Sequence, residues 1–273
     1  MEGFAFLPIL TTIVSGLILG SFFNVLIYRI PKGESIVWPG SRCTQCGRPI
    51  RAVENIPLFS YIFLGGRCAG CKEKISPQYP LVEFVTLCLA LVAWFFIAKP
   101  FLSSIHPWWE YLFLALQIIS FLILVPVAVI DYHHYIIPDA ISLGGLGCGI
   151  AFAFIPGGIT PLQSLYGILA GGGSLYLLGF VGELLFKKEA MGGGDIKLMA
   201  FLGAVWGWKI ALLSIMFGAV FGSILGVLLM AVRILPKDHQ IPFGPFLGLG
   251  FWLAVLFGEE LVRAYFQFVQ GMM

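Results

Sequence analysis

The stretch "MGGGDIKLMAFLGAVWGW" (Met191–Trp208) places an acidic residue, Asp195, directly behind three glycines and at the start of an apolar segment. A charge at the edge of a membrane-spanning segment costs free energy, so a functional role is the first hypothesis. The alternative is a helix N-cap with a flexible approach. Asp195 by itself leaves both interpretations open.

The chain around this stretch is strongly apolar. Of its 273 residues, 59% are hydrophobic and 11% are charged, whereas a soluble domain carries about 25% charged residues. We therefore predict an all-α polytopic membrane protein. Segments that can span a bilayer lie at residues 6–28, 81–98, 109–130, 137–156, 162–186, 195–208, 210–232 and 245–266. This pattern predicts about eight transmembrane helices, with a soft boundary at "WGWK" between the sixth and the seventh.

The basic residues predict the orientation. One side of these segments holds the Lys and Arg residues of segment 29–80, together with Lys187, Lys188, Lys197, Arg233 and Lys237. The other side holds only Lys99, Lys209 and Arg263. The positive-inside rule then places segment 29–80 in the cytoplasm and both termini outside.

Segment 29–80 is the only long polar insert, and it contains the two motifs "CTQC" and "CAGC". Two C-x2-C pairs at this separation are typical of a closed, tetrahedral and structural zinc site. A module of this size buries little core, so a metal ion can stabilise it. The alternatives are two reducible disulfides or cysteines that only pack, and a reducing cytoplasm argues against the disulfides. The predicted ligands are Cys43, Cys46, Cys68 and Cys71.

A second acidic residue, Asp131, closes the third apolar segment in "LVPVAVIDYHHYIIPDAISLGG". An acid at a helix C-terminus opposes the helix dipole, so its presence there needs another reason. Asp139, directly after a proline, is interpreted as a helix-start acid that the dipole favours. His133 and His134 are interpreted as interfacial loop residues, because neighbouring residues on a helix do not face the same way.

Asp131 and Asp195 fall on the same predicted membrane face, and they could form a carboxylate dyad. Two carboxyl groups held close together share one proton. The ionised partner can take a proton from water while the protonated partner hydrogen-bonds a substrate carbonyl. That is amide hydrolysis by an aspartic mechanism. The glycines before Asp195 would let an extended substrate backbone come close.

Several motifs resemble those of the bacterial type IV prepilin peptidases, in their bifunctional form. Beside the two cysteine pairs, the resemblance is carried by "GSFFNVLIYRIP" (Gly20–Pro31), "ENIPLFSYIFLGGRC" (Glu54–Cys68), "ISPQYPLVE" (Ile75–Glu83), "IDYHHYIIPD" (Ile130–Asp139), "AMGGGDIKL" (Ala190–Leu198) and "IPFGPFLGLG" (Ile241–Gly250). The glycine-acid element matches the family's G-x-G-D signature, with Gly192, Gly194 and Asp195 in its places.

The resemblance implies an aspartic endopeptidase of the bacterial inner membrane. Such an enzyme removes the basic leader of prepilins or pseudopilins after a glycine and methylates the new amino terminus with S-adenosylmethionine. Carried over by position, the catalytic pair is Asp131 and Asp195. The implied domains are a first transmembrane helix (1–28), a cytoplasmic zinc-binding insert associated with methylation (29–80) and a helical membrane peptidase domain (81–273). Prepilins and membrane lipid are the expected partners, and no nucleic acid is expected.

The methyl-transfer residues are harder to identify, because the sequence has no G-x-G-x-x-G nucleotide loop. The candidates beside the zinc module are Glu54, Gly66 and Glu83. Glu83 is equally well interpreted as a helix-start charge, and Glu54 as a solvated surface acid. Two other functions stay open. One is an intramembrane aspartic protease of the presenilin-like or preflagellin type, which does not explain the cysteines. The other is a transporter whose membrane acids carry protons or cations.

Overall fold

A computed structural model of the chain describes residues 3–188, 191–232 and 241–271. Among the residues named above, Ala190, Arg233 and Lys237 lie outside these ranges. The described residues are helical apart from loops and two isolated β-bridges, which confirms the all-α prediction. The chain divides into two compact units, Met1–Ile105 and His106–Met273.

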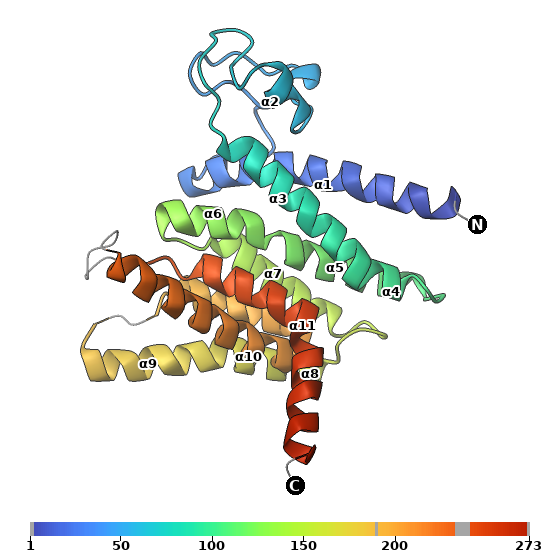
Figure 1. The fold of residues 1–273 in the computed structure, drawn as a ribbon, viewed down its shortest axis with the longest axis vertical. Coiled ribbons are helices and arrows are strands. Elements are labelled where there is room, and N and C mark those ends of the chain that lie inside the picture. The colour runs from blue at the N-terminus through green and yellow to red at the C-terminus, as the bar shows by residue number, and fades with distance from the viewer. Residues whose placement is uncertain (1–2, 189–190, 233–240, 272–273) are drawn as a thin grey trace. The chain divides into compact units, whose positions relative to one another are not determined.

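In the first unit, α1 (Gly3–Arg29) packs against α3 (Gln78–Ala93), and the insert lies between them in sequence (Figure 1). Gly16 and Gly20 of α1 let the two backbones approach, as small residues do in membrane helix pairs. A Cβ added at Gly20 would lie 2.7 Å from the Cα of Glu83, and one at Gly16 would lie 2.9 Å from the Cβ of Ala90. The long apolar stretches therefore form a close helix pair.

The insert has little regular structure of its own. The short elements of the first unit are η1 (Ile30–Lys32), η2 (Ala52–Glu54), α2 (Phe59–Phe63), η3 (Trp94–Ala98) and α4 (Lys99–Phe101). The buried Arg29 at the end of α1 fixes the start of the insert, because its guanidinium donates to the carbonyls of Ser35, Pro39 and Gly40. Two isolated β-bridges, Arg42 to Pro49 and Arg67 to Lys74, close the two cysteine loops.

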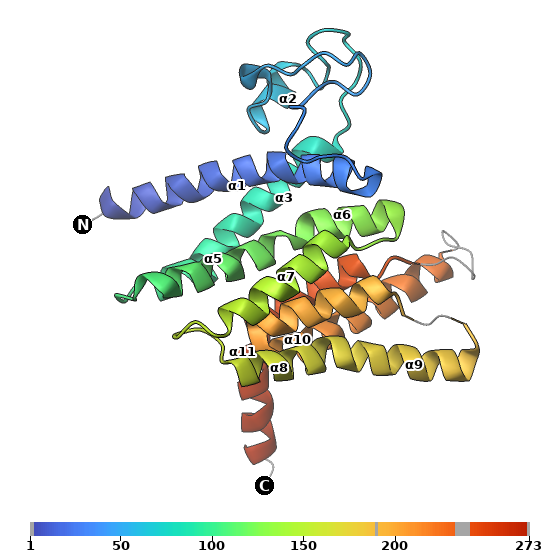
Figure 2. The ribbon, with the colours of Figure 1, turned by 180° about the vertical axis from the view of Figure 1, so that it is seen from behind.

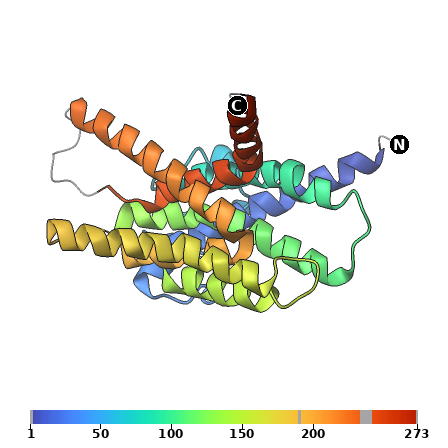
Figure 3. The same ribbon diagram turned by 90° about the horizontal axis from the view of Figure 1, so that it is seen from below.

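The second unit is a helical bundle around α10 (Gly193–Ala231). Figure 2 shows α10 between α7 (Asp139–Phe152) and α8 (Pro161–Ile168), and both helices contact it. Helix α11 (Gly244–Gly271) runs beside α10 and contacts it (Figure 3). A Cβ added at Gly218 of α10 would lie 3.0 Å from the carbonyl oxygen of Phe246. The remaining elements are α5 (Trp108–Leu122), α6 (Leu124–His134), η4 (Leu169–Gly173) and α9 (Ser174–Phe186).

Among the described residues, six helical segments are long and apolar enough to cross a membrane, and α7 is a shorter apolar helix. Helix α10 has 39 residues, which at 1.5 Å per residue exceeds the ~30 Å of a bilayer core. It is broken at Gly207, where φ is 81° and ψ is 175°. This break lies within the predicted "WGWK" boundary, so the sixth and seventh predicted segments correspond to the two parts of α10. The chain is a multi-pass membrane protein.

Candidate active site and metal centre

Asp131 lies in the last turn of α6 and is only 6% exposed. The helix ends because Tyr135 adopts a left-handed conformation (φ 56°), and its N–H donates to the carbonyl oxygen of Asp131 at 2.8 Å. The acid therefore stands at a helix C-terminus, as the sequence predicts. One favourable contact offsets that position, because the buried N–H of Gly244 donates to Asp131 Oδ2 at 2.8 Å.

Asp195 lies half-buried in the first turn of α10, where the helix dipole favours an acid. Within the described residues its carboxylate accepts no hydrogen bond, so the N-cap interpretation has no support there. Two of the three glycines before it lie close to other side chains. A Cβ added at Gly192 would lie 2.9 Å from Asp195 Oδ2, and one at Gly194 would lie 2.9 Å from the Cβ of Ile137.

The two predicted acids both lie in the second unit, on different helices. Asp131 of α6 and Asp195 of α10 are close enough to interact electrostatically. Next to them, Lys197 pairs with Asp139 Oδ1 at 2.7 Å and links α10 to the start of α7. Asp139 is the first residue of α7, which agrees with its interpretation as a helix-start acid. His133 and His134 lie in the final turn of α6 with exposed side chains, so the prediction that they belong to a loop is wrong.

The four predicted zinc ligands form one cluster in the insert. The Sγ atoms of Cys43, Cys46, Cys68 and Cys71 all lie within 4.8 Å of one another, and no disulfide joins them. The Sγ atoms of Cys43 and Cys71 are 3.9 Å apart. A tetrahedral ion with ligands at 2.3 Å separates its sulfurs by about 3.8 Å. The donor set and its spacing fit a structural metal site.

Backbone groups of the insert favour the thiolate form of Cys46 and Cys68, which is the form that binds metal. At Cys71 the N–H of Glu73 is outweighed by desolvation and by the neighbouring thiols, which raise the pKa to about 11. The N–H groups of Cys71 and Gly70 lower the pKa of Cys68 to about 6. The N–H of Arg48 likewise lowers the pKa of Cys46. The turns at the two cysteine pairs therefore point amide donors at the sulfurs of Cys46 and Cys68. Cys88 and Cys148, which are outside the cluster, are exposed on apolar helices, as expected for small hydrophobic residues in membrane segments.

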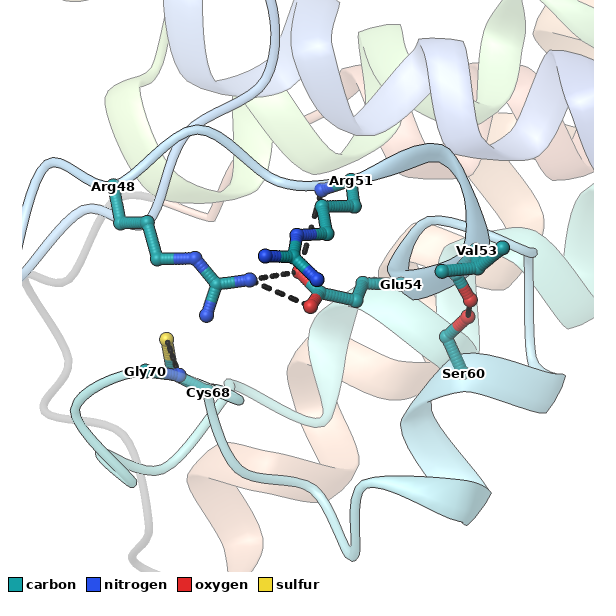
Figure 4. Close-up of polar contacts among 7 residues, drawn as sticks. All are labelled: Arg48, Arg51, Val53, Glu54, Ser60, Cys68 and Gly70. Atoms are coloured by element: carbon teal, nitrogen blue, oxygen red, sulfur yellow. Dashed lines mark hydrogen bonds and ion pairs between the residues drawn. The ribbon is translucent and has the colours of Figure 1, made fainter.

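Arg48 ties the two cysteine loops together (Figure 4). Its Nη2 lies 2.5 Å from both carboxylate oxygens of Glu54, and its side chain covers Gly70 of the second loop. The N–H of Arg51 and the Arg48 guanidinium lower the pKa of Glu54. Glu54 is thus a paired carboxylate rather than a solvated one, and it holds the first loop in place.

Glu83, unlike Glu54, is a buried carboxyl group. It is only 8% exposed, and its Oε2 accepts a hydrogen bond from the N–H of Leu58 at 2.7 Å. Leu58 has a positive φ of 63°, an uncommon conformation for a leucine. Glu83 therefore connects α3 to the insert. Helix α3 starts at Gln78, so Glu83 lies beyond its first turn. The interpretation of Glu83 as a helix-start charge is therefore wrong.

The first unit contains a cavity of about 980 Å³ between the insert and the helices α1 and α3. Glu54 and Glu83 both line it, as do Asn24, Tyr61, Tyr79 and Cys68. Gly66 is not in the lining. It lies behind the wall, because a Cβ added to it would be 3.0 Å from Cζ and Oη of Tyr61.

Sequence reasoning missed three of these residues. The motif "IPFGPFLGLG" contains Gly244, but nothing in it shows that a backbone N–H meets Asp131. Arg48 was counted only as a positive charge, although its position between the cysteine pairs was a signal for a local acid partner. Tyr61 lies in "ENIPLFSYIFLGGRC" and gave no signal, because a tyrosine in an apolar stretch usually packs.

Known families and proteins match almost the whole chain. The family described as the bacterial Peptidase A24 N-terminal domain matches residues 14–97, and the type IV leader peptidase family matches residues 116–227. A prepilin leader peptidase/N-methyltransferase of Pseudomonas aeruginosa is 35% identical over 95% of this chain and 94% of its own length. Proteins of the same name from Pseudomonas putida and Neisseria gonorrhoeae are also 35% identical, over 98% and 92% of this chain and over 96% and 91% of their own lengths.

No solved structure gives a significant match. The sequence relatives decide the assignment, because identity above 30% extends over nearly the full length of both chains. The chain belongs to the family of type IV prepilin leader peptidase/N-methyltransferases.

Proposed function

We propose that this protein removes the basic leader of type IV prepilins and pseudopilins after a glycine, and then methylates the new amino terminus with S-adenosylmethionine. The observation that supports cleavage is the placement of Asp131 and Asp195, on two different helices, within electrostatic range of each other and within the residues matched by the leader peptidase family. The transporter hypothesis is less well supported, because its acids would belong near the middle of the bilayer. These two stand at helix ends.

The dyad performs hydrolysis with one shared proton. The ionised carboxylate takes a proton from water as the water oxygen attacks the scissile carbonyl carbon. The protonated carboxyl gives its proton to the carbonyl oxygen. Breakdown of the tetrahedral intermediate then transfers a proton to the leaving nitrogen, and the C–N bond breaks. The open backbone at Gly192 and Gly193, both exposed, leaves room for an extended substrate beside Asp195.

The metal site holds the insert in shape. The four thiolates of the cysteine cluster would bind one zinc ion in a closed site with no position for a reacting water. Its role is therefore structural. The mutual distances of the sulfurs, the amide donors around them and the Arg48–Glu54 ion pair support this assignment. By charge distribution, the insert and the dyad both face the cytoplasm.

The cavity of the first unit is the site we assign to the methyl donor. It is large enough for a ligand of that size. S-adenosylmethionine, when bound, supplies a methyl group on a cationic sulfonium. Glu83 and Glu54 bring carboxyl groups to the lining, that of Glu54 already paired with Arg48, and Tyr61 offers an aromatic ring of the kind that attracts such cations. Gly66 acts through Tyr61.

Mass spectrometry of a co-expressed prepilin tests both activities at once. The wild-type chain should yield a product that lacks its leader and carries one added methyl group. Asp195→Asn should leave the precursor intact while the enzyme stays in the membrane fraction, and Glu260→Gln, which changes an exposed acid of α11, should process normally. Full processing by Asp195→Asn would refute the dyad. A cleaved but unmethylated product from the wild-type chain would favour a peptidase alone.

The same cleavage, measured with purified enzyme in detergent, separates hydrolysis from transport. An aspartic peptidase needs no ion gradient, so the precursor should be cut in micelles. Loss of processing whenever the membrane gradient is absent would favour the transporter hypothesis.

A further inference from the structure

The contact between Gly244 and Asp131 joins two segments that are 113 residues apart. Gly244 is the first residue of α11, and the first N–H groups of a helix have no partner within the helix. One of these free donors is buried in the unit and donates to Asp131 Oδ2 at 2.8 Å. A buried donor with a partner of this geometry is a specific interaction rather than a surface contact.

The residue at this position has to be small. A Cβ added at Gly244 would lie 2.7 Å from Oδ2, 3.1 Å from Cγ and 3.2 Å from Cβ of Asp131. The φ angle of Gly244 is not in the left-handed region, so its backbone conformation alone does not require glycine. Glycine is required because the carboxyl group of Asp131 occupies the space that a side chain on the Cα of Gly244 would need.

We propose that Gly244 is a positioning residue for the dyad, because its N–H and its missing side chain together fix the carboxyl group of Asp131 in one orientation. This inference rests on the proposed peptidase function. A carboxyl group otherwise rotates about a soft χ2 torsion. One oxygen held by the α11 amide leaves the other oxygen at a defined place for water or substrate. Catalytic groups need such fixed placement, since misplacement by about 1 Å can cost about 100-fold in rate.

The test compares two glycine-to-alanine variants in the same helix. Gly244→Ala keeps the N–H but crowds Asp131. Gly248→Ala, the matched control, is also buried, and its Cβ would meet only the Cβ of Leu124, at an ordinary 3.7 Å. Purified full-length enzyme in detergent is assayed with a prepilin peptide. For Gly244→Ala we expect kcat to fall by about 100-fold with KM nearly unchanged. Gly248→Ala should resemble the wild type.

Cleavage by Gly244→Ala at the rate of Gly248→Ala would overturn the inference, and so would a rise in KM at unchanged kcat. If Gly244→Ala folds but is too unstable for steady-state kinetics, a double-mutant cycle on thermal unfolding replaces kinetics. If Gly244→Ala destabilises the protein by crowding the carboxyl group, the same change should destabilise an Asp131→Ala protein much less. An equal loss of stability in both backgrounds overturns the inference. If the wild-type chain does not cleave, the proposed function fails, while the cycle still tests the contact.

Discussion

At the scale of single residues, Gly66 shows how a residue behind a cavity wall can influence what the cavity holds. It has a left-handed backbone (φ 65°), and its Cα faces the ring of Tyr61. Its neighbour Gly65 has a similar backbone (φ 60°), but a Cβ added there would meet nothing within 4 Å. The two positions therefore carry similar conformational strain and differ in their contact with Tyr61.

That difference allows a matched pair of variants. Both Gly65→Ala and Gly66→Ala introduce strain of about 1–2 kcal/mol. Only Gly66→Ala also displaces Tyr61 from the cavity wall. We expect methylation of a pre-cleaved pilin peptide to fall at least severalfold more in Gly66→Ala than in Gly65→Ala, with leader cleavage retained in both. Equal methylation rates in the two variants would remove Gly66 and Tyr61 from the methyl-donor site.

At the scale of elements, close packing of α1 on α3 depends on glycine. The Cα of Glu83 lies where a side chain at Gly20 would be, so no rotamer change can relieve the clash. By contrast, Gly147 of α7 has open space around its missing Cβ. The two glycines therefore differ in why they are present.

Thermal unfolding in detergent should separate them. Gly20→Ala should lower the free energy of unfolding by about 1–3 kcal/mol, the usual range for overpacking, and so lower the melting temperature. Gly147→Ala should be neutral or stabilise by up to ~1 kcal/mol, because alanine is the better helix former. A Gly20→Ala protein as stable as the wild type would contradict the close packing of α1 and α3.

The elements also show what sequence reasoning can and cannot reach. Long apolar runs and flanking charges predict where helices lie, and the pairing of cysteines within short loops predicts their cluster. These signals are local. The hydrogen bond between Gly244 and Asp131 leaves no such signal, since any residue but proline has a backbone N–H. The bond between Glu83 and Leu58 was missed for the same reason.

At the scale of the whole molecule, the two compact units carry different chemistry. The cysteine cluster and the cavity belong to Met1–Ile105, and the carboxylate pair belongs to His106–Met273. The domains proposed from the sequence divide after residue 80, which is earlier in the chain than the boundary after Ile105 between the two compact units. Loss of the metal should therefore reduce methylation more than leader cleavage.

Cys43→Ser removes one of the four thiolates. We expect the variant to contain less zinc by elemental analysis and its insert to be cut faster by a protease, because the metal contributes to folding of small modules. Methylation should fall further than leader cleavage. Cys88→Ser, a change on an exposed face of α3, is the control. Normal zinc content in Cys43→Ser would remove the metal assignment.

The break at Gly207 has a consequence for mapping the protein in its membrane. A single residue separates the two parts of α10, so the chain passes from one to the other without a loop. Reporter fusions and epitope tags need loop residues to accommodate them. A tag placed at this point would have to unwind a helix end, and the resulting loss of expression would be misread as a wrong orientation. The exposed loop at residues 102–105 offers a safer place for such a tag.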